Sequence, residues 1–111
     1  MTKRDYPTGK QEVLHRRGTT LVRRQQLAPG EATPWHRDPF HRVTVVLSGD
    51  RLDIEFRDGS ETIPWHVKAG EVHWIEPTET VHRAVNVGNE VFEEVVTFLL
   101  DRETAEPQPE A

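Results

Sequence analysis

Residues 30–49 read GEATPWHRDPFHRVTVVLSG and contain the most informative pattern of the chain. His36 and Asp38 are separated by one residue, so on a β-strand both side chains would point to the same face. A third candidate ligand, His82, lies far downstream. Two imidazoles and one carboxylate are the ligand set of mononuclear non-haem iron sites. The sequence therefore predicts a metal site on an all-β scaffold, with His36, Asp38 and His82 as ligands.

Short strand-like runs separated by turn residues extend on both sides of this stretch. In Arg51–Phe56 the apolar residues Leu52, Ile54 and Phe56 alternate with charged ones, which predicts an inward and a solvent-facing side. No segment of normal helix length shows 3.6-residue periodicity, so a sandwich or barrel is favoured over βαβ units. The expected strands are Gln11–Arg17, Thr20–Leu27, Pro34–His36, Arg42–Leu47, Arg51–Arg57, Glu61–Lys68, Glu71–Ile75, Val81–Val87 and Val91–Leu100.

The composition limits the classes of protein to consider. With 111 residues, 34% hydrophobic and 30% charged, the chain predicts one domain with a thin core, and a homodimer would add burial. The absence of cysteine excludes disulfides, thiolate catalysis and cysteine-ligated zinc or iron–sulfur sites. We expect a flexible segment at residues 1–10, the domain at 11–101 and a disordered Glu- and Pro-containing tail at 102–111.

Charge and targeting signals favour a protein that acts on small molecules. The net charge is −5 and no segment concentrates Lys or Arg, so nucleic-acid binding has little support. The N-terminus has no apolar signal region and no stretch approaches membrane-spanning length, so we expect no membrane partner and a cytoplasmic location.

Two spacings resemble the motifs of the cupin superfamily. The first cupin motif is G-x5-H-x-H-x3/4-E-x6-G. The same spacing is found here at Gly30, His36, Asp38, Arg42 and Gly49. The second is G-x5-P-x-G-x2-H-x3-N, and its positions are matched, with one extra residue before the proline, by Gly70, Pro77, His82 and Asn86. The resemblance covers roughly residues 20–100 and implies a small jelly-roll barrel, the double-stranded β-helix.

This chain departs from the cupin motifs at three positions. Asp38 replaces a histidine, Arg42 replaces the glutamate, and Glu79 replaces a glycine. The extra residue before Pro77 predicts a β-bulge. Arg42 cannot bind a cation, because a guanidinium offers no lone pair.

The resemblance implies a metal-dependent enzyme in which Asp38 supplies the carboxylate ligand. Fe(II) is the first choice of cofactor, and Mn, Ni, Co or Zn suit the same ligands. Arg42 and His41 are the candidate catalytic residues: Arg42 would hold a carboxylate on a small-molecule substrate, and His41 is either a fourth ligand or a rim residue. Dioxygenase, lyase, decarboxylase and isomerase chemistry all stay open. A 2-oxoglutarate oxygenase is disfavoured by the short chain, and a regulatory sensor by the lack of DNA-binding helices.

The alternative is a metal-free pocket protein, in which Asp38 and Arg42 neutralise each other. His36 and His82 would then be hydrogen-bonded residues of a ligand-binding module, or would serve an acid–base cyclase or isomerase together with Arg42.

Several other side chains have two interpretations each. If Leu27 points inward, Gln25 and Arg23 give the pocket polar walls. Glu93-Glu94 places one carboxylate on each face, a candidate general base, although a solvated position is favoured. Trp65 is expected in the core or at a dimer interface. The orientations of Trp35 and His73 are left open.

Overall fold

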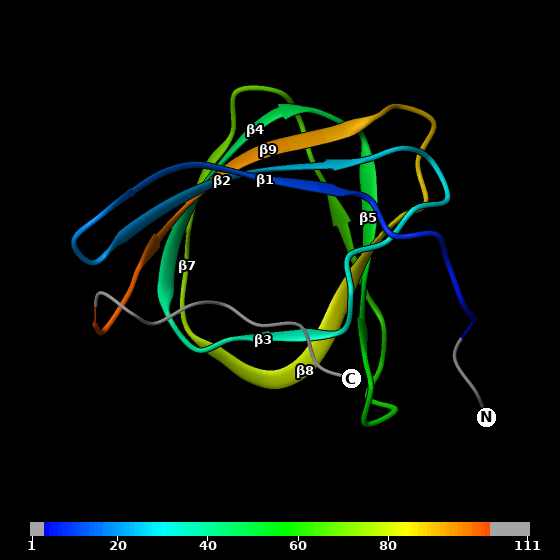
Figure 1. The fold of residues 1–111 in the computed structure, drawn as a ribbon. Helices are drawn as coiled ribbons and strands as arrows, with labels where there is room; N and C mark the ends of the chain where they lie inside the picture. The colour runs from blue at the N-terminus through cyan, green and yellow to red at the C-terminus, as the bar shows by residue number, and fades with distance from the viewer. Residues whose placement is uncertain (1–3, 103–111) are drawn as a thin grey trace.

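The computed structural model describes residues 4–102. In this range the regular elements are β-strands, connected by turns and loops (Figure 1). The strands are β1 (Lys10–Arg17), β2 (Thr20–Leu27), β3 (His36–Asp38), β4 (His41–Ser48), β5 (Arg51–Phe56), β6 (Ile63–His66), β7 (Val72–Ile75), β8 (Thr78–Asn86) and β9 (Phe92–Leu99). Within this described part of the chain there is no helix that could cross a membrane.

Two antiparallel sheets face each other and enclose the interior of the barrel (Figure 1). One sheet has the order β1-β2-β9-β4-β7 and the other the order β3-β8-β5-β6. Sequence-distant strands therefore lie side by side: β3 pairs with β8, and β4 pairs with both β7 and β9. This arrangement confirms the predicted all-β jelly roll.

The strand boundaries differ from the prediction around the two motifs. β3 covers His36–Asp38 rather than Pro34–His36, and β8 begins at Thr78 rather than Val81. β7, which lies between Gly70 and Pro77, pairs with β4 without a register shift, so the bulge expected before Pro77 does not occur in this pairing. A register shift occurs instead between β3 and β8, where His36 lies opposite His82 and Asp38 opposite Thr78.

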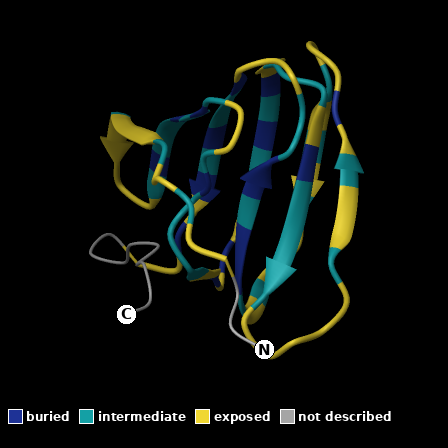
Figure 2. Cartoon of the chain, turned by 90° about the vertical axis from the view of Figure 1, so that its right-hand side faces the viewer, coloured by how far each residue is buried: buried dark blue, intermediate teal, exposed yellow. Residues whose placement is uncertain are grey.

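Two apolar clusters fill the two ends of the barrel strands. The inward-facing positions between the clusters are polar and line a cavity. The first cluster contains Leu21, Phe40, Val96, Phe98 and Leu100. The second contains Leu27, Val46, Leu52, Val67 and Phe92. Buried positions concentrate in the central strands, while peripheral segments are exposed (Figure 2). On β2, β4 and β9 the inward residues between the clusters are polar, namely Arg23, Gln25, Arg42, Thr44 and Glu94. Period-2 alternation thus places polar groups inside the barrel.

Hydrogen bonding of the domain reaches back into the segment predicted to be flexible. The Gly9 N–H donates to the Ala32 carbonyl at 3.0 Å, and the Ala32 N–H donates to the Pro7 carbonyl at 2.9 Å. Pro7 and Gly9, within that segment, are thus held to the barrel by backbone hydrogen bonds. Of the predicted tail, residues 103–111 lie outside the described residues.

The motif glycines hold backbone conformations that other residues avoid. Gly30, Gly49 and Gly70 have φ values of 87°, 128° and 93°. At Gly49, a Cβ atom would also lie 2.9 Å from Cδ1 of Phe92 in the core. The glycines of both motifs are thus required by the turns that hold the barrel strands in register.

Gly49→Ala should therefore destabilise the fold more than a glycine replacement at an open turn. We expect the free energy of unfolding to fall by about 2–3 kcal/mol, because strain and crowding against Phe92 act together. The control is Gly59→Ala, where φ is 87° and no atom lies within 4 Å of the added Cβ. Its expected loss is about 1 kcal/mol. Urea unfolding of both variants measures this, and equal losses would contradict the packing argument.

Candidate metal centre

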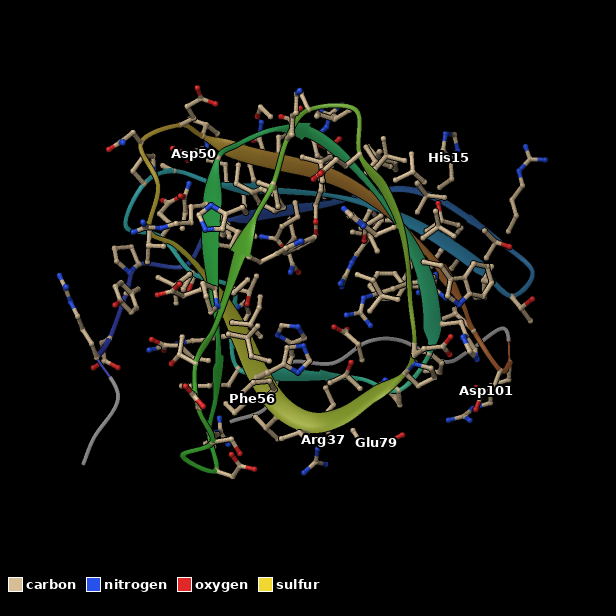
Figure 3. All side chains as sticks on the ribbon, turned by 180° about the vertical axis from the view of Figure 1, so that it is seen from behind. His15, Arg37, Asp50, Phe56, Glu79 and Asp101 are labelled. Atoms are coloured by element: carbon tan, nitrogen blue, oxygen red, sulfur yellow. The ribbon has the colours of Figure 1, made fainter. Side chains whose placement is uncertain are left out.

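Strands β3 and β8 bring the three predicted ligands together. His36 pairs with His82 across the two strands, and Asp38 follows two residues after His36 on the same inward face. Arg37, between them, points away from the barrel (Figure 3). His36, Asp38 and His82 each offer one ligand atom, and these atoms all lie within 4.8 Å of one another. The structure therefore brings together the three residues that the sequence analysis singled out.

Backbone carbonyls fix the orientation of both imidazoles. The Nδ1 atom of His36 lies 2.7 Å from the Pro34 carbonyl, and that of His82 lies 2.8 Å from the Thr80 carbonyl. A carbonyl only accepts hydrogen bonds, so both Nδ1 atoms carry a proton. In a neutral imidazole the lone pair then resides on Nε2.

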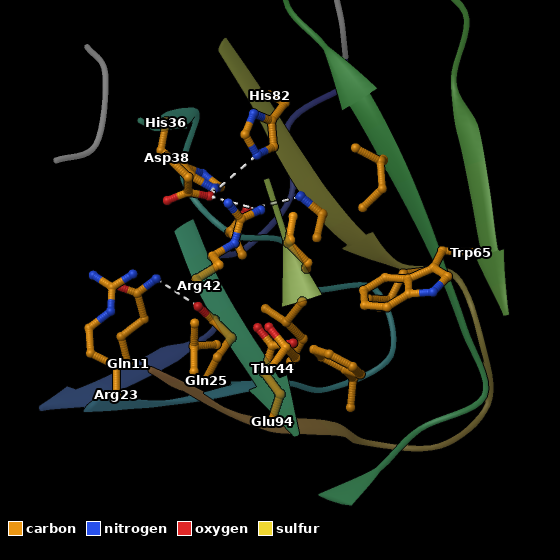
Figure 4. A pocket seen from close by; sticks show the side chains of 18 of the residues that line it. Gln11, Arg23, Gln25, His36, Asp38, Arg42, Thr44, Trp65, His82 and Glu94 are labelled. Atoms are coloured by element: carbon orange, nitrogen blue, oxygen red, sulfur yellow. Dashed lines mark hydrogen bonds and ion pairs between the residues drawn. The ribbon is translucent and has the colours of Figure 1, made fainter. Parts of the chain in front are cut away.

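Both Nε2 atoms point at the same carboxylate oxygen. His36 Nε2 lies 3.1 Å and His82 Nε2 lies 3.5 Å from Asp38 Oδ2 (Figure 4). Lone pairs facing a carboxylate repel it, so the arrangement requires positive charge, supplied by protons on the rings or by a cation among the three atoms. The donor set fits a divalent cation, and a carbonyl-bound Nδ1 is the usual support for a metal-binding histidine.

Asp38 is a buried anion. Only 6% of its side chain is exposed, and in the part of the chain that the structure describes its buried Oδ1 atom has no hydrogen-bond partner. Burial raises the pKa of Asp38, but hydrogen bonds with His36 and His82 and the charges of His36 and Arg42 lower it by more, so the carboxyl pKa lies well below its usual range. A carboxylate is therefore present at neutral pH, which is the form that binds a metal.

Arg42 lies beside this group on the next strand. Its Nη2 atom is 3.5 Å from Asp38 Oδ2, and its side chain is only 12% exposed. Its Nη1 atom is buried and has no hydrogen-bond partner among residues 4–102. Arg42 thus contacts Asp38 with one nitrogen and leaves another available to a ligand.

The three candidate ligands and Arg42 border a cavity of about 90 Å³ (Figure 4). Gln25 and Arg23 contribute to its wall, as the inward orientation of Leu27 predicted. Gln25 receives a hydrogen bond from Gln11 at 2.6 Å, and Arg23 stacks over Phe98 with 4.7 Å to the ring centroid. Trp65 also lines the cavity while packing against the second apolar cluster.

Glu94 lines the same cavity, which corrects the expectation of a solvated side chain. It lies between the inward residues Phe92 and Val96 on β9, so alternation directs it into the barrel. Burial raises the pKa of Glu94 to about 7, with the charges of Arg42 and Arg23 opposing the shift and that of Asp38 adding to it. The cavity therefore contains a carboxyl group that exchanges protons near neutral pH.

His41 is not part of this group, contrary to its interpretation as a fourth ligand. β4 begins at His41, so the alternation that turns Arg42 inward turns His41 outward. Its Nδ1 atom accepts a hydrogen bond from the Trp74 indole at 3.2 Å and lies 3.1 Å from Glu76 Oε2. His41 is an outer-rim residue.

On the outer face, an arginine stacks on two aromatic rings behind the strands that carry His36 and His82. The sequence analysis did not predict this stack. Arg83, which follows His82, is only 6% exposed and pairs with Glu55 at 2.7 Å. Its guanidinium lies over the Trp35 ring at 4.3 Å and over the Tyr6 ring at 5.0 Å. Glu55, predicted to face water, is therefore largely covered. Trp35 and Arg83 adjoin His36 and His82 in the chain and contact each other on the outer side of the sheet. The two histidines face each other on the inner side.

Comparisons with known proteins agree with this architecture. The cupin domain family model matches residues 23–98. A cupin domain from Bordetella pertussis Tohama I is 21% identical, with a TM-score of 0.75 over 87% of this chain and 98% of that chain. A Klebsiella pneumoniae protein with a double-stranded β-helix domain is 24% identical, with a TM-score of 0.68 over 98% of this chain and 90% of that chain.

An oxalate oxidase solved with glycolate is also similar. It is 26% identical, with a TM-score of 0.57, and the match covers 77% of this chain and 44% of the oxalate oxidase chain. A search of curated proteins finds no significant match. The family match spans most of the chain, and the fold and the motif positions agree with it; the chain belongs to the cupin family.

Proposed function

We propose that this protein is a metal-dependent cupin enzyme that acts on a small, carboxylate-bearing substrate. His36, Asp38 and His82 would hold the cation, with Fe(II) as the first candidate and Mn, Ni, Co or Zn as alternatives. The bound ion would act as a Lewis acid that polarises a substrate oxygen. The reaction would be of the dioxygenase, lyase or isomerase type.

The orientation of the two imidazoles is the observation that carries the proposal. With both Nδ1 protons donated to backbone carbonyls, the two Nε2 atoms converge on one oxygen of a buried aspartate at 3.1 and 3.5 Å. The orphaned Asp38 Oδ1 is a further acceptor that a ligand would satisfy, since an unmatched buried polar atom costs about 1–3 kcal/mol.

The metal-free alternative rests on one contact. Arg42 Nη2 lies 3.5 Å from Asp38 Oδ2 and partly neutralises the carboxylate. With both histidines protonated, the cluster would then be an ion-pair network that serves a binding pocket or acid–base chemistry. The two proposals differ in whether a cation or two protons separate the Nε2 atoms from Asp38.

Arg42 and Glu94 supply the chemistry that a carboxylate substrate needs. The unpaired Nη1 atom of Arg42 is available to a substrate carboxylate, and its fixed guanidinium favours a bidentate contact. Glu94 lines the same cavity with a pKa near 7, which suits a group that takes up or releases a proton at its carboxyl oxygen. The similar oxalate oxidase, solved with a small hydroxy acid, supports the assignment of a carboxylate substrate.

Metal analysis of untagged protein tests the proposal. After anaerobic loading with Fe(II) or Mn(II) and dialysis, the wild type should retain about one equivalent, whereas His82→Ala and Asp38→Ala should bind at least about 100-fold more weakly. The matched control is His15→Ala on the exposed strand β1, which should load like the wild type. Wild-type protein that stays metal-free with Fe(II), Mn(II), Ni(II) and Zn(II) would favour the metal-free pocket.

Arg42→Gln should separate cation binding from substrate binding. Removing a positive charge 3.5 Å from Asp38 should strengthen Mn(II) binding by about 3- to 10-fold, because the charge repels the cation. Binding of small carboxylates should weaken by at least about 10-fold, since their charged partner is lost. Calorimetry measures both affinities, and unchanged carboxylate binding would contradict the anchoring role.

Glu94→Gln should change the pH dependence of stability in a stated direction. The native state keeps the Glu94 proton up to a pKa of about 7, while the unfolded chain loses it near 4.5, so wild-type stability falls as the pH rises through this window. Relative to the wild type, the metal-free variant should gain on the order of 1–3 kcal/mol between pH 4.5 and 7.5.

Chemical unfolding across this pH range, with a chelator present, provides the measurement. The control is Glu93→Gln, which removes the same charge at the adjacent position of β9, outside the cavity lining. If both variants keep the wild-type slope, the assigned burial of Glu94 is wrong.

A further inference from the structure

A larger hollow of about 400 Å³ lies next to this cavity, with Arg42 in the wall of both. The two spaces adjoin, because Arg42, Ile54, Trp65, Ile75 and His82 line both of them. β6 and β7 are terminal strands of the two sheets, and residues of both border the outer hollow. The outer hollow therefore lies between the candidate metal centre and exposed residues of these two strands, and we call it the mouth.

The walls of this mouth are mainly apolar. Its large apolar side chains are Ile54, Phe56, Ile63, Trp65, Trp74 and Ile75. Ile63 is 53% exposed and Trp74 is 57% exposed. Both line the same hollow as the buried Arg42. Exposed apolar side chains around an opening are typical of a surface that binds a ligand or partner.

Volume and charge identify the kind of ligand. The inner space of about 90 Å³ is equivalent to about three water molecules and admits only a small polar head. The outer hollow of about 400 Å³ lies within the usual range for pockets that hold organic ligands, about 300–1,000 Å³. The buried, unpaired Nη1 atom of Arg42 lies on the residue where the two spaces meet.

We infer that the substrate is an amphipathic acid, with a carboxylate or related oxyanion at Arg42 and an apolar body of six to eight carbons or one aromatic ring in the mouth. The inference rests on the proposed function for the anionic end only. A dicarboxylate of oxalate size would fill the inner space and leave the apolar walls in water, so it would gain nothing from them.

Calorimetry with a series of straight-chain carboxylates tests this inference. Acetate, butanoate, hexanoate, octanoate and 3-phenylpropanoate are titrated into Mn(II)-loaded and metal-free protein. Affinity should rise by about 3- to 4-fold for each added methylene that the mouth covers, and 3-phenylpropanoate should bind at least about 30-fold more tightly than acetate.

Rim variants identify where the gain arises. Ile63→Gln and Trp74→Ala should each reduce octanoate affinity by at least about 5-fold and leave Mn(II) and acetate affinity unchanged. The control is Val91→Ala, because Val91 is similarly exposed, at 48%, but does not line the mouth. It should bind the whole series like the wild type.

The outcomes separate this inference from the proposed function. Affinity that does not change with chain length in the Mn(II)-loaded protein would overturn the amphipathic substrate and leave the metal centre intact. Affinity that rises with chain length in a protein that binds no metal would support the inference while the metal-dependent function fails. If sedimentation shows that both rim variants convert a dimer to a monomer without changing octanoate affinity, the mouth is a contact between two copies and the inference is overturned.

Discussion

The buried carboxylate of Asp38 is the constraint on which the site depends. An anion with 6% of its side chain exposed is stable only if positive charge surrounds it, because removing a charge from water costs several kcal/mol. His36, His82 and Arg42 all direct nitrogen atoms at Asp38 Oδ2. Arg42 alone leaves Oδ1 unmatched and the two imidazole lone pairs facing an anion. A cation bound among the two Nε2 atoms and Oδ2 would meet the imidazole lone pairs and the carboxylate charge together, which is the state that the proposed function requires.

The fold supports this group from both sides of one sheet. Inside, His36 and His82 face each other with ring centroids 4.5 Å apart. Outside, Trp35 and Arg83, their immediate neighbours in the chain, stack in the same way. Since successive strand residues point to opposite faces, the outer stack lies directly behind the inner histidine pair. Chemistry-bearing residues therefore stand on rigid strands rather than on loops, as a pre-organised site requires.

Period-2 alternation and motif spacing were enough to predict the barrel, the grouping of His36, Asp38 and His82, and the polar wall formed by Gln25. Alternation also decides the orientation of His41, which had been left open, and of Glu94, for which a solvated position was favoured. His41 precedes the inward Arg42 and so must face out, and Glu94 lies between Phe92 and Val96 and so must face in. The stack of Arg83 on Trp35 and Tyr6 could not be predicted, because it joins three segments that no local pattern connects. The apolar mouth depends likewise on how the two sheet edges meet in space.

Anomalous diffraction from crystals soaked in Zn(II) tests the central claim most directly. The account predicts one anomalous peak about 2.1 Å from Nε2 of His36 and of His82, with the Asp38 carboxylate as the third protein ligand. A map with no peak among these three residues, in which both imidazoles donate hydrogen bonds to Asp38 and Arg42 completes the ion-pair network, would contradict it.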